Sequence, residues 1–275
     1  MVVLFALTER SCSMLGRNGV FCLGVIHAWA VPTVLSSQPV LEPQDAPCWV
    51  RMAPLPLTML READIGWERR VWRAVDLKDR SSLPILSAKR GDERCPDLFA
   101  VLRHGLMTEG GITAYLPGSA WSDDTFASPM DRASVERMFA AFDSTRGELT
   151  RILLKEDWIF DLRRSEMEVR IIGLALQVAD TGEDGEFRGH RTLCWFHYPE
   201  CRLWISHWSC ASDPDGAPIT FNDLFERRMF RSAVLKVSNT RNTAIGSHGQ
   251  GSDALFQSDA VRDQLFRMGF DLWHY

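Results

Sequence analysis

The stretch Lys155–Asp161 (KEDWIFD), followed by Val169–Gly173 (VRIIG), decides the fold class of this chain. Charged and aromatic side chains alternate in the first run with strand-like spacing, and the second run is a continuous apolar strand. Alternating charges are typical of a solvated or ion-paired strand face. We therefore interpret the charges of the first run as the edge of a strand scaffold, and not as the paired carboxylates of an acid–base catalyst.

More strands are predicted along the chain from segments rich in Ile, Val, Trp and Phe. The polar loop from Asp180 to Gly189 separates two of them, as a hairpin connection would. The predicted strands cover residues 112–115, 152–161, 167–179, 192–198, 202–208 and 233–237.

Helices are predicted where apolar residues recur at helical spacing or where a capping residue precedes them. Thr220 and Asp223 form a capping box with Asp in the place of the usual Glu. Leu83–Leu86 is expected to be an extended link. The first helix is predicted to start at Asp64, with Trp67, Val71, Trp72 and Val75 on one side. A second follows Asp97, and a third contains the stripe Val135, Met138, Phe139 and Phe142. The last two start at Thr220 and at Ser258, and the helix from Ser258 ends at Gly269. Helices and strands mix without regular βαβ alternation, which favours an α+β class with a mixed, mainly antiparallel sheet and packed helices in one compact body.

The N-terminus has the pattern of a secretory signal peptide. Arg10 and Arg17 precede an apolar run that ends at an Ala-x-Ala exit at Ala30, so we expect a signal peptide over 1–30, with cleavage there or as late as residue 37. A bulky Phe21 before Cys22 argues against a lipoprotein, and a buried N-terminal helix is the alternative. A Pro-rich extended lead-in is expected over 31–60, and the main domain over 61–275.

Composition fits a globular exported body. The chain has 31 basic and 36 acidic residues, a net charge of −5, and cleavage at residue 30 makes it −6. A mildly acidic chain with interspersed signs argues against nucleic acid as a partner. The chain has ten Trp residues, one of them in the signal segment, and the other nine require burial or an interface.

Three cysteines and two histidines form the one pattern that resembles a metal site. Cys194, His197, Cys201, His207 and Cys210 have the spacing C-x2-H-x3-C-x5-H-x2-C, which could supply zinc ligands. Strand alternation weakens this reading, because Cys194 and His197 would face opposite sides. A disulfide within Cys194, Cys201 and Cys210, or unpaired packing, are the alternatives.

Five cysteines remain after cleavage, because Cys48 and Cys95 join these three. This odd number leaves at least one cysteine free or joined to another chain. The sequence does not decide the pairing. No catalytic set, cofactor site or metal site is assigned.

Scattered short motifs from Asp64 to the C-terminus, about three quarters of the chain, resemble the GldN/PorN family. They are Ala63–Ile65 with Trp67, Arg70–Arg73, Asp76-Leu77, Gly111–Tyr115, the opening stretch with Ser165 and Met167, Tyr198–Arg202, Asp223–Glu226, Arg228–Phe230, Lys236, Ser238-Asn239, Asp253–Leu255 and Asp271–Tyr275. Their shared order and spacing carry the resemblance. The Pro-rich lead-in and the segment 246–251 depart from the family pattern.

The resemblance implies a non-enzymatic structural subunit of the periplasmic ring of the type IX secretion and gliding motility apparatus. It implies a location at the inner face of the outer membrane, self-association in the ring, and two partners. These are an outer-membrane lipoprotein (GldK/PorK) and the periplasmic part of the motor protein (GldM/PorM). An exported zinc-binding enzyme and a soluble periplasmic ligand-binding protein are the alternatives.

A ring needs head-to-tail contacts between two different patches on each subunit, and Trp and Arg are frequent anchors of such patches. The candidate anchors are Trp72, Arg73, Trp158, Arg170, Arg202, Arg228 and Trp273. Burial of the tryptophans in the core is the alternative for each of them.

Overall fold

The computed structural model describes residues 48–86, 95–108, 111–118, 126–144, 149–182, 184–238, 244–245 and 252–272. Every described residue belongs to the unit Leu41–Tyr275, which we call the second unit. The predicted signal segment, most of the lead-in, the segment 246–251 and Trp273 lie outside the described residues.

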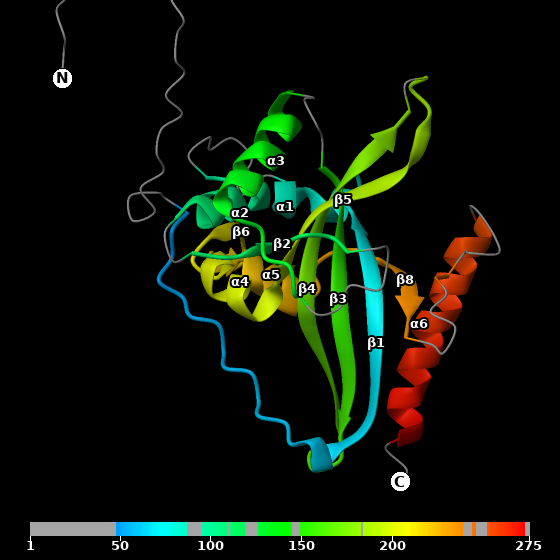
Figure 1. The fold of residues 1–275 in the computed structure, drawn as a ribbon. Helices are drawn as coiled ribbons and strands as arrows, with labels where there is room; N and C mark the ends of the chain where they lie inside the picture. Colours follow the sequence, from blue (N-terminus) through cyan, green and yellow to red (C-terminus); the bar gives the residue numbers. More distant parts are fainter. Residues whose placement is uncertain are drawn as a thin grey trace, which may run out of the picture. The chain divides into compact units, whose positions relative to one another are not determined.

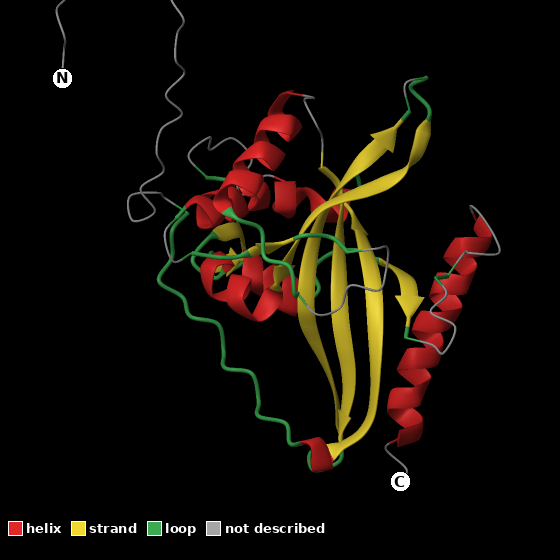
Figure 2. Ribbon diagram, in the orientation of Figure 1, coloured by secondary structure: helices red, strands yellow, loops and turns green. Residues whose placement is uncertain are grey.

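A six-stranded sheet forms the centre of the second unit, in the order β2-β5-β4-β3-β1-β8, and its pairs are antiparallel (Figures 1 and 2). The strands are β1 (Ile65–Asp76), β2 (Ala114–Tyr115), β3 (Leu149–Asp161), β4 (Glu166–Thr181), β5 (Phe187–His197) and β8 (Ala233–Val237). A small two-stranded sheet joins β6 (Ser209–Ser212) to β7 (Pro218–Thr220). The α+β class with a mainly antiparallel sheet is confirmed.

Six helices accompany the sheet in the described residues. They are α1 (Leu83–Leu86), α2 (Leu98–Met107), α3 (Arg132–Ser144), α4 (Tyr198–Ile205), α5 (Phe221–Glu226) and α6 (Ser252–Leu272). Asp97 caps α2 by accepting a hydrogen bond from the Ala100 amide, and α5 has the predicted capping box of Thr220 and Asp223.

The main core lies between the sheet and helices α1 to α5. Leu154 and Leu174 of the sheet are fully buried there with Leu102 of α2 and Phe225 of α5. A second cluster lies under α6, where Leu265 packs with sheet residues that include Val71 and Val234. Figure 1 shows α6 beside β8 and β1, apart from the other helices.

Strand β1 corrects the predicted helix from Asp64. Trp67, Val71 and Val75 are separated by four residues, a spacing that places them on one face of a strand as well as on one face of a helix. Antiparallel neighbours on both sides decide the outcome, because Val71 pairs with Glu156 of β3 and with Val237 of β8.

Three other boundaries were predicted wrongly. Leu83–Leu86 is one helical turn, and it accommodates Pro84 because the first turn of a helix needs no amide donor there. Residues 202–208 belong largely to α4, whose first turn holds Pro199, and not to a strand. Helix α6 starts six residues before the predicted Ser258 and continues through Gly269.

Candidate interaction surfaces

The charged stretch of β3 lies in the middle of the sheet, between β1 and β4, so its interpretation as an edge is wrong and its ion pairing is confirmed. The register places Asp157 opposite Arg70 of β1 and Arg170 of β4. Arg70 donates two hydrogen bonds to the Asp157 carboxylate, at 2.6 and 2.8 Å. Such a bidentate contact fixes both side chains on that face of the sheet.

The same face continues to the turn between β3 and β4. Arg164 donates to Asp161 at 2.7 Å and also contacts Glu168, which accepts from Arg170 at 2.7 Å. The hydrogen bond from Arg164 lowers the pKa of Asp161. We call this group of charges, together with Arg70 and Asp157, the ion-paired end of the sheet.

Glu156 lies on the opposite face of β3 and is fully buried. Its carboxylate accepts a hydrogen bond from Trp158 Nε1 at 2.9 Å and pairs with the Arg228 guanidinium at 2.5 Å. Arg228 follows α5 with φ 54°, in the left-handed region that non-glycine residues rarely adopt. Two predicted anchors, Trp158 and Arg228, thus meet at a buried carboxylate.

The other predicted anchors also have partners inside the chain. Trp72 is buried, with Lys236 Nζ 4.5 Å from the centre of its ring. Arg202 is buried, donates to the Leu55 carbonyl at 2.8 Å and lies 3.6 Å from Glu226. Burial raises the pKa of Glu226, and the arginines near it oppose this shift. The anchor role of these residues stays a prediction.

Residues 48–61 form an extended segment that we call the strap. A disulfide joins Cys48 to Cys95, and the Val50 amide donates to the His207 carbonyl at 2.8 Å. Further along, Arg170 donates to the Thr58 carbonyl. Leu55 and Met59 are 85% and 86% exposed, so the strap presents apolar side chains to solvent.

The remaining cysteines occupy the core. Cys194, Cys201 and Cys210 are free and buried, and burial raises the pKa of each thiol to about 12. A disulfide among these three is therefore wrong. Within the described residues, no group of His, Cys, Asp and Glu has the arrangement of a metal site. Cys194 lies on β5 and Cys201 on α4, and both are packed in the apolar core.

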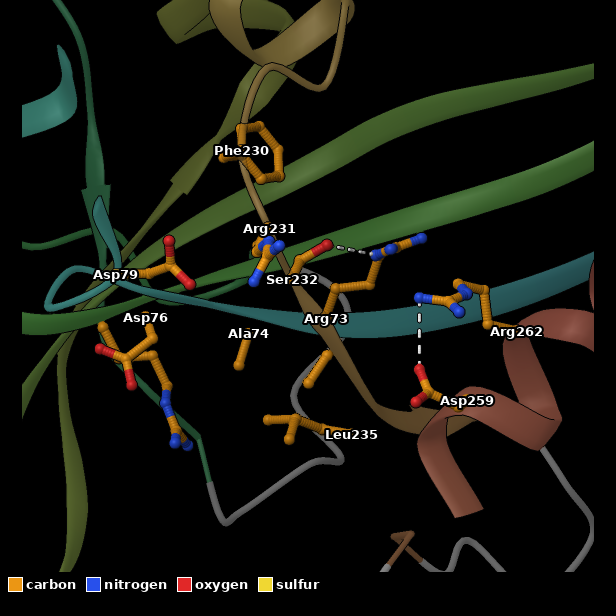
Figure 3. A pocket seen from close by; sticks show the side chains of 12 residues that line it. Arg73, Ala74, Asp76, Asp79, Phe230, Arg231, Ser232, Leu235, Asp259 and Arg262 are labelled. Atoms are coloured by element: carbon orange, nitrogen blue, oxygen red, sulfur yellow. Dashed lines mark hydrogen bonds and ion pairs between the residues drawn. The ribbon is translucent and has the colours of Figure 1, made fainter. Parts of the chain in front are cut away.

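A cleft of about 690 Å³ lies beside β1, β8 and α6. Figure 3 shows side chains from several elements around it. The residues that line it are Arg73, Ala74, Asp76, Asp79, Arg151, Phe230, Arg231, Ser232, Ala233, Leu235, Asp259 and Arg262. We call it the arginine cleft, because it has four arginines and three aspartates.

Three of these arginines have no carboxylate within 4.0 Å among the described residues: Arg73, Arg151 and Arg231. Arg73 donates instead to Ser232 Oγ at 3.0 Å, and the Arg151 Nε is buried without a hydrogen-bond partner in the described part of the chain. Burial lowers the pKa of Arg73 and of Arg151. Of the four, only Arg262 has carboxylates within 4.0 Å in the described part of the chain, those of Asp259 at 3.2 Å and Asp263 at 3.9 Å.

Sequence reasoning identified Arg73 as a possible anchor but missed the cleft. Its arginines come from β1, β3, the segment before β8 and α6, which lie far apart along the chain. Since no local spacing connects these positions, only the tertiary structure brings them together.

Strand β3 pairs with β4 only as far as Leu149, which lies opposite Val178. Beyond this point β4 and β5 continue as a two-stranded hairpin. Figure 1 shows this two-stranded arm running past the other strands. At its tip Asp180, Asp184 and Glu186 are exposed, and Phe187 is 60% exposed. The arm (residues 179–190) therefore presents carboxylates around an aromatic ring.

None of the described helices is both long and apolar enough to cross a bilayer.

Comparison with known protein families identifies a match over most of the chain. The family model of "Gliding motility associated protein GldN" matches residues 60–274. The match includes all six strands of the main sheet and all six helices. No curated protein matches the chain.

Proposed function

The chain belongs to the GldN family of gliding motility associated proteins, and we propose that it is a structural subunit, without catalytic activity, of the periplasmic ring of the type IX secretion and gliding motility apparatus. The observation that carries this proposal is the family match over residues 60–274, which spans the described body apart from most of the strap.

The use of charge in the body supports a scaffold role. A catalytic reading of this region would pair Asp157 with Asp161, or Glu156 with Glu166. Asp157, Asp161 and Glu156 each accept a hydrogen bond from an arginine. Charge-assisted hydrogen bonds from arginines fix these carboxylates within the sheet. These groups stabilise the sheet instead.

Export to the periplasm is part of the proposal. The disulfide between Cys48 and Cys95 supports it, because disulfides persist in oxidising compartments such as the periplasm. In this proposal the ring lies at the inner face of the outer membrane. Its other members are a lipoprotein of the GldK/PorK kind and the periplasmic part of a GldM/PorM motor.

Affinity purification of the full chain from a detergent extract of outer membranes tests the proposal. We expect an outer-membrane lipoprotein to co-purify in a fixed ratio and to persist through washing with salt. A chain that purifies alone and sediments as a monomer would contradict the ring role and would favour a solitary binding protein. Chelator-sensitive activity with one bound zinc would favour the exported enzyme.

Substitution of predicted anchors refines the test. Trp158 and Arg170 are partly exposed, so Trp158→Ala and Arg170→Ala can change a contact surface directly. If either variant loses the lipoprotein while its circular dichroism stays native, that residue is an anchor. Trp72→Ala serves as the comparison, because Trp72 is buried and its loss should reduce stability first.

A further inference from the structure

We propose that the arm and the arginine cleft are the two halves of one head-to-tail contact, in which the arm of one copy of this chain enters the cleft of the next. The inference rests on the proposed ring function and names the surfaces that would join its subunits. A head-to-tail contact needs two different, complementary patches on each subunit. The arm and the cleft are such a pair.

The cleft has the chemistry to bind carboxylates. Arg151 and Arg231 have no carboxylate within 4.0 Å among the described residues, and a guanidinium binds a carboxylate with two parallel hydrogen bonds. Figure 3 shows Arg73 and Arg262 extending toward the same side of the cleft. Burial lowers the pKa of Arg73 most, Glu156 opposes this shift, and the like charges of Arg228 and Arg262 add to it. A carboxylate placed there would relieve this repulsion.

The cleft also has an apolar part. Phe230, Leu235 and Ala74 contribute to its lining. A volume of about 690 Å³ is in the range that accepts a drug-sized ligand, which corresponds to a few side chains of a loop. The site therefore fits an aromatic side chain flanked by carboxylates better than a single small anion.

The arm tip has this composition. Phe187 is 60% exposed, and among the described aromatic groups it contacts the His190 ring, at 5.0 Å between ring centres. Asp180 and Glu186 lie near it, with exposed side chains that form no salt bridge to a described residue. An exposed aromatic residue surrounded by charge is typical of a hot spot at a protein contact.

The tip of the arm cannot reach the cleft of its own chain, although the base of the arm at His190 lies close to Arg151. Arg151 of the cleft pairs in register with Gln177 of β4. The turn at Gly182 lies five residues further along the same strand, roughly 16 Å away at ~3.3 Å per residue. Bending the tip back would break the ladder between β4 and β5, so its partner has to be a second molecule.

Another copy of this chain fits better than a polyanion. Asp76 and Asp79 line the cleft between the arginines, and they would repel a dense run of phosphates. Separate carboxylates around an aromatic ring can avoid them. Every copy of the chain has both surfaces, so the contact can repeat around a ring.

Charge reversal on exposed positions tests the contact. The cleft variant is Arg231→Glu with Arg262→Glu, and the arm variant is Asp180→Lys with Glu186→Lys; all four side chains are exposed. The matched control is Arg132→Glu with Arg137→Glu, two exposed arginines on α3. Sedimentation measures self-association of the full chain in the lipoprotein complex, and co-purification measures retention of the lipoprotein in the same sample.

We expect both test variants to weaken self-association by about tenfold or more and the control to leave it unchanged. Combining the cleft and arm reversals in one chain should restore assembly, because the charges are complementary again. A mixture of the two single-surface variants should also assemble, because the native arm fits the native cleft and the reversed arm fits the reversed cleft. Assembly unchanged by both reversals, or loss of assembly that the combined variant does not rescue, would overturn the inference.

The results distinguish a failure of the proposed arm–cleft contact from a failure of the proposed ring function. If the lipoprotein co-purifies with every variant and only self-association is lost, both stand. Loss of the lipoprotein in the arm variant, with self-association intact, would mean that the arm binds the lipoprotein and would refute the inference alone. If the wild-type chain retains no lipoprotein, the proposed function fails. Self-association of the purified chain, with and without the reversals, then decides the inference independently.

Discussion

The arginines at the ion-paired end of the sheet differ from those of the arginine cleft in one respect. Arg70, Arg164 and Arg170 each contact a carboxylate of the same chain, whereas Arg73, Arg151 and Arg231 have none within 4.0 Å among the described residues. Both regions involve β1 and β3, so the contrast exists within one sheet. A guanidinium with an internal partner contributes to folding, and one without such a partner can bind another molecule.

Variants in the two regions should therefore lose different properties. Loss of a carboxylate at the ion-paired end, or at Glu156, should cost stability. Reversal of an exposed cleft arginine should cost association and little stability.

The largest effect is expected for Glu156→Ala. It removes a fully buried carboxylate and leaves Arg228 and Trp158 Nε1 without their acceptor. Two different donors lose their acceptor, and the Arg228 side chain is partly exposed and can turn to water, so we expect a cost of about 3 kcal/mol. Urea denaturation measures this loss, with Glu166→Ala, an exposed neighbour on β4, as a control that should change by no more than ~0.5 kcal/mol.

A smaller loss is expected for Asp157→Ala. Asp157 is buried and accepts two hydrogen bonds from Arg70, but the Arg70 side chain is about a third exposed and can turn to water. Hydrogen bonds to charged groups contribute about 1.5–3 kcal/mol, so we expect a cost of about 2 kcal/mol. Denaturation that matches the wild type would show that the pair adds nothing to the sheet.

The next effect depends on pH. Arg164 lowers the pKa of Asp161 below its ordinary value, so the ionised side chain stabilises the fold above the unfolded-state pKa, and this contribution is lost as pH falls through the folded-state pKa. Asp161→Asn should therefore lower the melting temperature at pH 7 and have less effect near pH 3. A difference between variant and wild type that stays constant from pH 7 to pH 3 would contradict this assignment.

The smallest effect on stability is expected for Arg231→Glu. Arg231 is exposed and has no salt bridge to a described carboxylate, so the free energy of unfolding should change by no more than ~0.5 kcal/mol. The same variant should reduce self-association, which sedimentation measures. A large loss of stability would mean that Arg231 contributes to folding, as the arginines of the ion-paired end do. It would contradict the proposed difference between the two groups of arginines.

The sequence predicted the fold where neighbours along the chain decide the structure. Thr220 and Asp223 form their capping box locally, and the hairpin between β4 and β5 follows from the polar loop at Asp180 to Gly189. Strand β1 could not be assigned in this way, because residues 67, 71 and 75 satisfy both periods and the pairing with β3 and β8 decides between them.

The cleft and the disulfide could not be predicted for the same physical reason. Arg73, Arg151 and Arg231 meet only after β1, β3 and β8 have paired. Cys48 and Cys95 are 47 residues apart, and nothing local distinguishes this pair from the other possible pairs among five cysteines. Tertiary contacts between distant segments determine both features.

The disulfide also divides the five cysteines outside the predicted signal peptide by reactivity. In an unfolded chain any two of them can be joined by an oxidant, yet three are buried thiols in the folded chain. Because the core encloses Cys194, Cys201 and Cys210, folding protects these thiols from exchange with the disulfide of the strap.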